Sequence, residues 1–303
     1  MTTTTKLKAA VIGLGSMGLG MARCIAKSGM EITGFDLNPD ALKGLAQAGG
    51  KTAVSAAEAA AGSDVLVIVV VNAAQTRMIL FGENGAAAKM QRGGVIVSCA
   101  TMSPENAKSF AKEAQALGLH YLDAPISGGA AKAATGDLTF MASGAQEAFA
   151  RAKPVLDVVA GKVYHLGDAA GAGASFKMVN QLLAGVHIAA ACEAMTFAAR
   201  LGLDLDKVYE VITASAGNSW MFENRVPHIL EGDYAPRSAI SIFTKDLGII
   251  SDMSRQEKFP VQMASSALQM FLATAACGME GDDDASVARM IAQVCGLELP
   301  KKS

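Results

Sequence analysis

A lysine lies between a glycine-rich turn and an amide pair in the stretch that runs from Gly171 to Gln181. This residue, Lys177, stands at the predicted start of a long apolar helix. Apolar surroundings and the positive end of a helix both disfavour a charged amine. An amine whose pKa falls from its usual value of about 10.4 toward neutrality can accept and return a proton. The alternative for these residues alone is a helix-entry lysine whose ammonium reaches water and does no chemistry.

A second group of residues could hold an anion. Ser127, Gly128 and Gly129 lead into an Ala-rich helical turn. A serine and two glycines at a helix start direct several backbone N–H groups one way, and such a nest binds a carboxylate or a phosphate. The alternative is a glycine hinge that binds no ligand, since paired glycines also occur in ordinary loops.

A third group has the pattern Gly-x-Gly-x-x-Gly, which is typical of a dinucleotide-binding turn. It stands between an apolar run at 8–12 and a helical pattern at 21–28. In this pattern Gly13 permits a tight turn, Gly15 lets a pyrophosphate approach the backbone, and Gly18 lets the helix pack on the strand. The predicted cofactor-binding residues of the turn are Gly13, Leu14, Gly15, Ser16, Met17 and Gly18.

An acidic residue follows the second predicted strand, at the distance from the glycines where a ribose 2′-hydroxyl is held. This residue is Asp36, and the next residues, Leu37-Asn38-Pro39, include no arginine. A 2′-phosphate would therefore meet repulsion and no compensating cation. The sequence predicts NAD as the cofactor in preference to NADP.

The order of apolar runs indicates which secondary-structure elements position these groups. Strand patterns occur at 8–12, 31–35, 65–71, 94–98, 121–124, 138–142 and 163–166, with helical patterns between them. This alternation predicts an α/β fold with a Rossmann-type doubly wound parallel sheet. After Gly173 only helices are predicted, at 175–201, 204–214, 222–230, 241–257, 261–278 and 284–294. We therefore predict an NAD-binding domain over 1–168 and an all-helical substrate and oligomerisation domain over 169–303, joined by a long helix.

Composition narrows the classes of function. Hydrophobic residues make up 51% of the chain, charged residues 18%, and the net charge is −2. Because no basic stripe is present, nucleic acid is not expected as a partner. The apolar stretch 181–203 is interrupted by His187, Glu193 and Arg200, which favours a buried helix over a membrane span. Helices that are apolar nearly all round also predict a homodimer or homotetramer.

A cytoplasmic location is expected. The first residues lack the apolar segment of a secretory signal, and the five cysteines are scattered without paired spacing. Such cysteines are typical of thiols in a reducing compartment.

Two further polar groups allow a functional and a structural interpretation. Lys245 and Asp246 lie in the middle of a predicted helix, where the structural alternative is an exposed ion pair. The acidic run at 280–284 resembles a metal site, but we predict a solvated loop that caps the following helix. No metal is predicted.

With these motifs in order, the chain resembles the β-hydroxyacid dehydrogenase family, which includes 3-hydroxyisobutyrate dehydrogenases and tartronate semialdehyde reductases. The resemblance covers nearly the whole chain and depends on four motifs, at 13–22, 123–129, 171–180 and 245–247. The runs 219–227 and 232–239 look most like the L-threonate dehydrogenase branch. One departure is Asn180-Gln181 where many members have Asn-Asn, which leaves open the amide that touches substrate.

The resemblance implies reversible hydride transfer between NAD and a hydroxyl-bearing carbon of a small hydroxy acid. It implies that Lys177 is the general base for oxidation and the general acid for reduction. The substrate-binding residues are then Ser127, Gly128 and Gly129 for the carboxylate, and Asn180 or Gln181 for the hydroxyl. Thr101, near the nicotinamide, and Lys245, closing over the cofactor, complete the implied cofactor-binding set.

Three functions compete. The first is oxidation of L-threonate to 2-oxo-tetronate. The second is a 3-hydroxyisobutyrate dehydrogenase or a tartronate semialdehyde (2-hydroxy-3-oxopropionate) reductase. The third is a non-catalytic NAD-binding module, against which the presence of Lys177 and the anion nest argues.

A pocket wall with hydrogen-bond donors suits an acid that bears several hydroxyls. We predict that Asn218, Trp220, Phe222 and Arg225 form this wall. The alternative is plain helix packing, with Trp220 as a core anchor.

Overall fold

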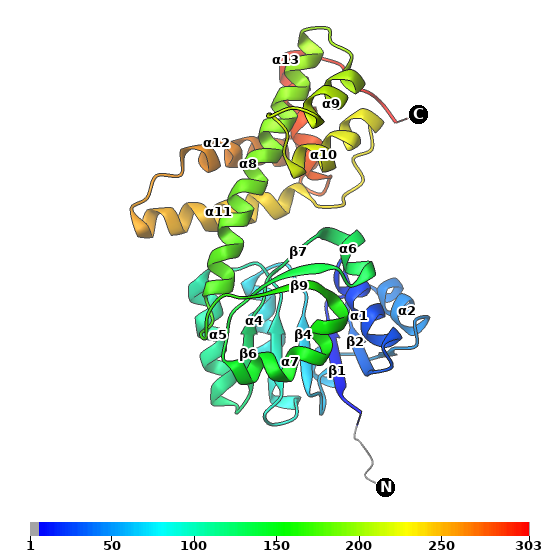
Figure 1. The fold of residues 1–303 in the computed structure, drawn as a ribbon, viewed down its shortest axis with the longest axis vertical. Helices are drawn as coiled ribbons and strands as arrows, with labels where there is room; N and C mark the ends of the chain where they lie inside the picture. Colours follow the sequence, from blue (N-terminus) through cyan, green and yellow to red (C-terminus); the bar gives the residue numbers. More distant parts are fainter. Residues whose placement is uncertain (1–5, 303) are drawn as a thin grey trace. The chain divides into compact units, whose positions relative to one another are not determined.

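The computed structural model describes residues 6–302. The chain forms two compact units, one up to Lys177 and one from Met178 onward, and Figure 1 shows the order of their elements. One long helix, α8 (Ala172–Arg200), begins in the first unit and continues into the second. The predicted division of function between 1–168 and 169–303 stays a prediction.

The first unit contains a six-stranded parallel sheet with the strand order β3-β2-β1-β4-β5-β6. This order belongs to dinucleotide-binding folds, in which ligands bind outside the carboxyl ends of the strands, where the order reverses. Here the reversal lies between β1 and β4. The predicted Rossmann-type sheet is confirmed. The strands are β1 (Lys8–Ile12), β2 (Glu31–Phe35), β3 (Lys51–Thr52), β4 (Val65–Ile68), β5 (Val95–Ser98) and β6 (His120–Asp123).

Three further strands form a separate sheet, β7 (Ile126–Ser127), β8 (Leu138–Ala142) and β9 (Ala160–His165). The sequence interpretation placed 138–142 and 163–166 in the doubly wound sheet, and for these two strands it is wrong. β7 pairs with β8 in the antiparallel sense, so β8 turns away from the parallel sheet. The burial of β8 alternates, whereas β4 and β5 are buried throughout. Continuous burial is the mark of a parallel sheet covered on both faces.

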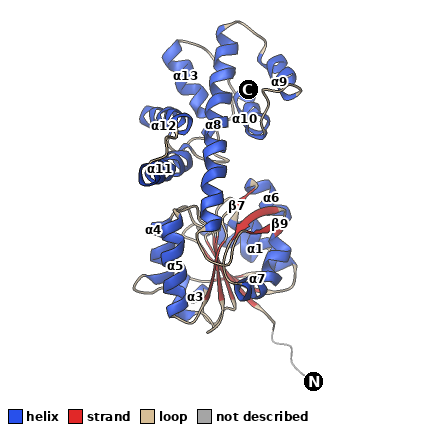
Figure 2. Cartoon of the chain, turned by 60° about the vertical axis from the view of Figure 1, so that its left-hand side comes forward, coloured by secondary structure: helices blue, strands red, loops and turns tan. Residues whose placement is uncertain are grey.

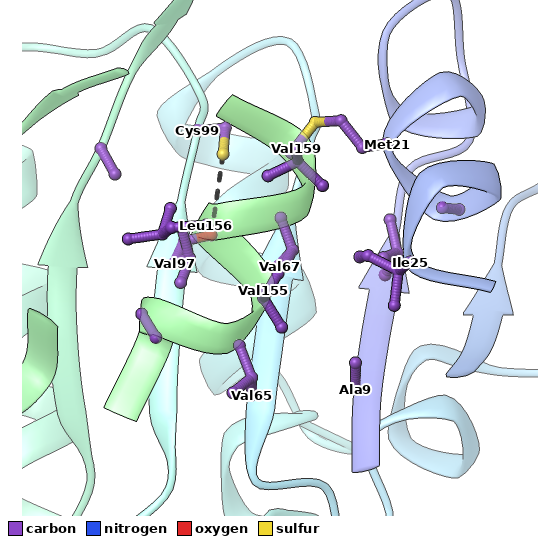
Figure 3. Close-up of a cluster of buried hydrophobic side chains, with 14 of the residues drawn as sticks. Ala9, Met21, Ile25, Val65, Val67, Val97, Cys99, Val155, Leu156 and Val159 are labelled. Atoms are coloured by element: carbon purple, nitrogen blue, oxygen red, sulfur yellow. Dashed lines mark hydrogen bonds between the residues drawn. The ribbon is translucent and has the colours of Figure 1, made fainter. Parts of the chain in front are cut away.

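Helices cover both faces of the parallel sheet. On one face, Met21 of α1 and Val155 and Val159 of α7 pack in the same buried cluster as Val67 and Val97 (Figure 3). The helices of this unit are α1 (Gly18–Lys27), α2 (Pro39–Ala46), α3 (Ala56–Ala59), α4 (Ala73–Phe81), α5 (Pro104–Ala116), α6 (Gly129–Thr135) and α7 (Gln146–Val159). At the start of α5, Ser103 Oγ accepts a hydrogen bond from the N–H of Asn106 and Pro104 is the first helical residue.

Within residues 178–302 the named elements of the second unit are all helices, joined by loops, as the colouring in Figure 2 shows. Its core is a cluster of buried apolar side chains that includes Ile188 and Cys192 of α8, Phe243 of α11 and Phe271 of α12. The predicted helix 261–278 is α-helical only to Thr274 and continues as a π-helical turn. The other elements are α9 (Leu205–Thr213), α10 (Trp220–Glu231), α11 (Ile240–Glu257), α12 (Gln262–Thr274), η2 (Ala275–Met279), η3 (Asp284–Ser286) and α13 (Val287–Cys295).

By length and composition alone, α8 could cross a membrane, a test that core helices of soluble proteins also pass. Within the second unit Ile188, Cys192 and Met195 of this helix are fully buried in the core. In the same helix Leu183 and Phe197 are exposed. The predicted buried helix is therefore buried along one side.

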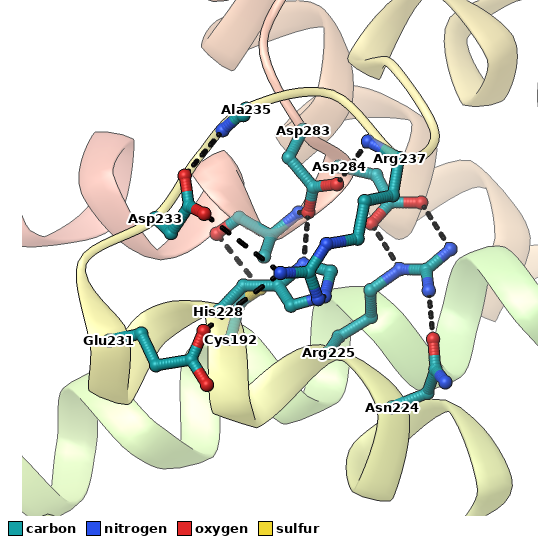
Figure 4. Close-up of polar contacts among 11 residues, drawn as sticks. Cys192, Asn224, Arg225, His228, Glu231, Asp233, Ala235, Arg237, Asp283 and Asp284 are labelled. Carbon is teal, nitrogen blue, oxygen red and sulfur yellow. Dashed lines mark hydrogen bonds and ion pairs between the residues drawn. The ribbon is translucent and has the colours of Figure 1, made fainter.

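Buried polar pairs hold the second unit together (Figure 4). Arg225 donates from Nε and Nη2 to the two oxygens of Asp284, at 2.5 and 3.1 Å. His228 Nδ1 lies 2.8 Å from Oδ1 of Asp283, and both carboxylates are fully buried. The predicted solvated acidic loop is therefore wrong for these two residues. The predicted capping is confirmed, because Asp283 accepts a hydrogen bond from the N–H of Ala285 at the start of η3.

The pKa values of these two carboxyl groups are shifted in opposite directions. Burial raises the pKa of Asp284 to about 6, against the opposing charge of Arg225. Burial alone would also raise the pKa of Asp283, but hydrogen bonds from His228 and from the backbone N–H of Arg237 hold that pKa below its usual value.

Candidate active site

The three glycines of the cofactor turn have different surroundings. Gly13 follows β1 with φ +89°, and a Cβ there would overlap the carbonyl oxygen of Val69. A Cβ on Gly18 would overlap the carbonyl oxygen of Gly13. Among the described residues, by contrast, no heavy atom outside Gly15 and its two chain neighbours lies within 4 Å of the place that a Cβ of Gly15 would take. Gly13 and Gly18 therefore serve the turn and the helix packing, and Gly15 leaves room for a ligand.

The start of α1 is suited to a phosphate. Within the described part of the chain, no side chain caps this helix at Met17, so the first N–H groups of the helix are available to an anion. Gly15 and Ser16 are exposed at the tip of the turn. Leu14 is turned inward, with its side chain buried. These surroundings fit the pyrophosphate of a dinucleotide.

Asp36 is fixed at the end of β2 by two backbone hydrogen bonds. Its Oδ2 accepts from the N–H of Leu14 at 2.6 Å, and its Oδ1 accepts from the N–H of Asn38 at 2.7 Å. The first of these bonds ties the carboxylate directly to the glycine turn. The carboxylate is only partly buried, so it can also accept from a ribose hydroxyl.

The parallel sheet brings several predicted residues to one edge. The turn at 13–18 follows β1, Asp36 follows β2, Thr101 lies in the loop after β5, and the nest at 127–129 comes shortly after β6. The carboxyl ends of parallel strands lie at the same edge of a sheet, where ligands bind in this fold. Thr101 is half-buried there.

The backbone of the anion nest has the conformation that its two glycines predict. Gly128 and Gly129 have φ values of +136° and +73°, which L side chains rarely adopt, and α6 begins at Gly129. Gly129 is exposed, and among the described residues no atom beyond its chain neighbours and its own helix backbone lies within 4 Å of the place that a Cβ would take. The nest is therefore accessible to a small anion.

The helix of the nest packs directly on the helix of the cofactor turn, a contact that sequence reasoning missed. A Cβ on Gly20 of α1 would lie 2.7 to 2.9 Å from backbone atoms of Ala133 and Ala134 in α6. The thiol of Cys24, one turn later, lies 3.7 Å from the carbonyl oxygen of Ala133. The signal in the sequence was a fourth glycine, two residues after the end of the fingerprint.

Lys177 lies beside the nest in the first unit. Its side chain is buried, and its Nζ donates a 2.8 Å hydrogen bond to the carbonyl oxygen of Ile126, the residue before Ser127. The alternative of a lysine that reaches water is therefore wrong. The structure brings together the predicted proton-transfer group and the predicted anion-binding group.

The amide pair is part of a hydrogen-bond chain within the second unit. Asn180 Nδ2 donates to Oε1 of Gln181 at 2.9 Å, and Gln181 Nε2 donates to Oδ2 of Asp246 at 2.5 Å. Lys245 pairs with the other oxygen of Asp246. Because Asp246 is 1% exposed, the alternative of an exposed helix pair is wrong. Both polar groups of Gln181 are used internally, so Asn180 is the amide better able to reach a ligand.

Asp123 is a further residue that sequence reasoning did not single out. Its buried carboxylate accepts hydrogen bonds from the N–H groups of Gly171 and Ala174, at 2.9 and 2.8 Å, at the start of α8. Burial raises its pKa, and these hydrogen bonds oppose the rise. The available signal was a carboxylate in an otherwise apolar run ahead of Ser127.

The predicted pocket wall needs correction. Arg225 is used by the buried pair with Asp284, and Phe222 is a core residue that stacks on Tyr209 with ring centroids 6.1 Å apart. Both side chains face the interior of the second unit, where these partners already engage them. The alternative that Trp220 anchors the core is wrong too, because this side chain is 57% exposed. Asn218 and Trp220 remain the candidates for the wall.

Comparison with known proteins identifies the family. Residues 8–167 match the model for the NAD-binding domain of 6-phosphogluconate dehydrogenase. Residues 171–291 match the model described as NAD-binding of NADP-dependent 3-hydroxyisobutyrate dehydrogenase. The chain belongs to the β-hydroxyacid dehydrogenase family. It is an NAD-dependent oxidoreductase that acts on a small hydroxy acid.

Three relatives show where in the family the chain stands. An L-threonate dehydrogenase from Cupriavidus necator is 51% identical over 97% of this chain and 98% of its own. The crystal structure of a 3-hydroxyisobutyrate dehydrogenase from Salmonella typhimurium is 49% identical, has a TM-score of 0.90 and matches 94% of this chain and 100% of its own. The mitochondrial 3-hydroxyisobutyrate dehydrogenase of Mus musculus is 31% identical over 93% of this chain and 86% of its own. The names of the two more similar relatives differ in substrate.

Proposed function

We propose that this enzyme oxidises L-threonate to 2-oxo-tetronate with NAD⁺, at the carbon next to the carboxylate. The observation that carries the chemistry is the buried Nζ of Lys177 beside the nest at 127–129. The substrate is supported by relatives named L-threonate dehydrogenase that are 45 to 51% identical over almost the whole chain.

In the proposed mechanism the nest holds the substrate carboxylate. Ser127 Oγ and the N–H groups of Gly128 and Gly129 donate to its oxygens, and this fixes the neighbouring carbon. Asn180 orients the hydroxyl, and Gln181 holds the Asn180 side chain through the 2.9 Å hydrogen bond. The substrate is thereby placed before any bond changes.

Lys177 is the proton acceptor in this mechanism. A neutral amine keeps N–H donors and gains one lone pair, so it can donate to the carbonyl oxygen of Ile126 and still accept the hydroxyl proton. NAD⁺ held at the carboxyl edge of the sheet would supply the hydride acceptor. In the reverse direction Lys177 returns the proton to the new hydroxyl.

The cofactor is held by the residues at the carboxyl edge of the sheet. The N–H groups at the start of α1 bind the pyrophosphate, with Gly15 leaving room for it, and Asp36 accepts from the ribose hydroxyls. We assign Ser16 and Met17 to the phosphate side of this site, Thr101 to the nicotinamide side and Lys245 to a closing contact on the cofactor. Leu14 supports the turn from within.

A second candidate substrate is 3-hydroxyisobutyrate, which the name of the Salmonella relative favours. The deciding experiment measures kcat/KM for L-threonate, 3-hydroxyisobutyrate and glycerate with NAD⁺ by the absorbance of NADH. A polar wall rejects an analogue that lacks the matching hydroxyl by about 10⁴-fold or more when its polar groups are left unpaired. We expect L-threonate to be preferred by at least about 10²-fold, since Asn218 and Trp220 are only two such groups. Equal or better turnover of 3-hydroxyisobutyrate would reject the substrate assignment and leave the mechanism standing.

We further propose a soluble, cytoplasmic homodimer or homotetramer without nucleic-acid or membrane partners. All five cysteines are unpaired, as in a reducing compartment. Large apolar side chains of the second unit are exposed, and helices of this kind commonly pair with a second copy. These side chains are Leu183, Phe197, Leu201, Met263 and Leu272. Light scattering at micromolar concentration tests this assembly, and a mass near 31.1 kDa would contradict it.

A further inference from the structure

Asp123 stands where the two sheets of the first unit meet. It is the last residue of β6, and its backbone pairs with Ser143, which follows β8, in an isolated antiparallel bridge. The two N···O distances of this bridge are 3.0 and 2.8 Å. The backbone of Asp123 is therefore fixed by both sheets.

The side chain of Asp123 holds the start of α8. The first N–H groups of a helix have no partner within the helix, and Oδ2 of Asp123 accepts from two such groups, those of Gly171 and Ala174. The hydroxyl of Ser143 completes the contact, because it donates to the same Oδ2 at 3.3 Å and accepts from the N–H of Gly173 at 2.9 Å.

The fit between helix and strand is close at this point. A Cβ on Gly173 would lie within 2.5 Å of the carbonyl oxygen of Asp123 and would overlap that of Met141. The start of α8 therefore rests directly on the backbone of the strands.

The short segment that begins at Asp123 also forms a hydrogen bond with Lys177. Three residues after Asp123, the carbonyl oxygen of Ile126 accepts from Nζ of Lys177, and the next residue, Ser127, begins the nest. The segment 123–127 thus contacts α8 at its first turn and again at Lys177.

We propose that Asp123 is a positioning residue that sets Lys177 Nζ against the anion nest, and so against the substrate hydroxyl. This inference rests on the proposed function of Lys177 as proton acceptor. Asp123 itself need not touch the substrate, because its carboxylate is 2% exposed and is occupied by α8 and Ser143.

The test is a double-mutant cycle of Asp123→Ala and Lys177→Ala, with kcat measured at saturating L-threonate and NAD⁺. Misplacement of a reacting group by about 1 Å costs about 10²-fold in rate. We expect Asp123→Ala to lower kcat by about that factor in the wild-type background, with the Kd for NAD unchanged. In the Lys177→Ala background we expect a further loss of less than about twofold, because a residue that acts only through Lys177 has nothing left to position.

The opposite outcomes separate the two proposals. If Asp123→Ala lowers kcat by the same factor in both backgrounds, the residue has a general structural role and the inference is wrong. If Asp123→Ala leaves kcat near the wild-type value while Lys177→Ala abolishes it, only the positioning inference fails. If Lys177→Ala retains the wild-type kcat, the proposed function fails instead.

Milder variants keep the test decisive if Asp123→Ala does not fold. Ser143→Ala removes one hydroxyl from the same contact and should lower kcat by about fivefold, again only when Lys177 is present. Asp123→Asn keeps an acceptor oxygen for the N–H groups of α8 and should restore kcat to within about tenfold of wild type. Ser55→Ala, which removes the N-cap of α3, is the matched control and should leave kcat unchanged. A Ser143→Ala effect of equal size in both backgrounds would reject the inference.

Discussion

Replacing Arg225 by leucine should destabilise the second unit strongly and leave substrate binding intact. Asp284 is fully buried, and its two oxygens accept from Arg225 at 2.5 and 3.1 Å. Removing one partner of such a pair leaves a buried charge without compensation, at a cost of about 3–5 kcal/mol in the free energy of unfolding. An exposed pair such as Lys153–Asp157 is worth about 0.5 kcal/mol or less, so Lys153→Ala is the matched control.

The stability lost in Arg225→Leu should depend on pH because Asp284 can be protonated. Its folded-state pKa of about 6 is raised above the usual value of an aspartate. The contribution of this group to stability is therefore present at acidic pH and is lost as the pH rises through 6. Without Arg225 the pKa rises further, since the opposing charge is gone. The destabilisation by Arg225→Leu should thus be the full 3–5 kcal/mol at about pH 8 and about 1–3 kcal/mol at about pH 5, where a neutral carboxyl is buried.

Urea denaturation followed by far-ultraviolet circular dichroism measures both values. The double variant Arg225→Met with Asp284→Leu removes both charges and should regain most of the stability. An equal loss at both pH values, or a double variant as unstable as the single one, would show that the Arg225–Asp284 pair does not have this energetic role. If instead the stable double variant shows a KM for L-threonate raised by about tenfold or more, Arg225 is a substrate ligand, as its place in the sequence first indicated.

Two predictions concern the cofactor turn. Asp36→Ala combined with Leu37→Arg should narrow or reverse the preference for NAD over NADP, because a cation replaces the carboxylate near the 2′-position; equal use of both cofactors by the wild type would show that Asp36 is misassigned. Gly20→Ala should push α6 away from α1 and raise the KM for the hydroxy acid more than the Kd for NAD, since a Cβ there meets the backbone of Ala133. Unchanged steady-state constants would show that the contact is not needed.

Local signals predicted the cofactor turn and most helices correctly. The spacing of Gly13, Gly15 and Gly18 between a strand and a helix depends on neighbouring residues alone, and the structure has β1 and α1 at these places. The caps of α2 and α5, where Asn38 and Ser103 accept from N–H groups of the following turn, are equally local. Such features are readable from sequence because their partners lie within a few positions.

Long-range pairing could not be predicted in the same way. A strand pattern at 138–142 does not say that β8 pairs with β7 rather than with the parallel sheet. Asp123 and its partner Gly171 are 48 positions apart, and Arg225 and Asp284 are 59 apart. The predicted pocket wall failed for the same reason, because nothing near Arg225 in sequence shows that its charge is already neutralised.

In the proposed mechanism, Lys177 accepts the proton of the substrate hydroxyl. The most direct test measures NADH formation from L-threonate by the wild type and by Lys177→Ala, with NAD binding and circular dichroism as checks on the fold. General acid–base groups contribute about 10²–10⁴-fold, so kcat should fall by that factor while the Kd for NAD stays within about twofold. A folded Lys177→Ala variant that keeps more than about a tenth of the wild-type kcat would contradict the claim.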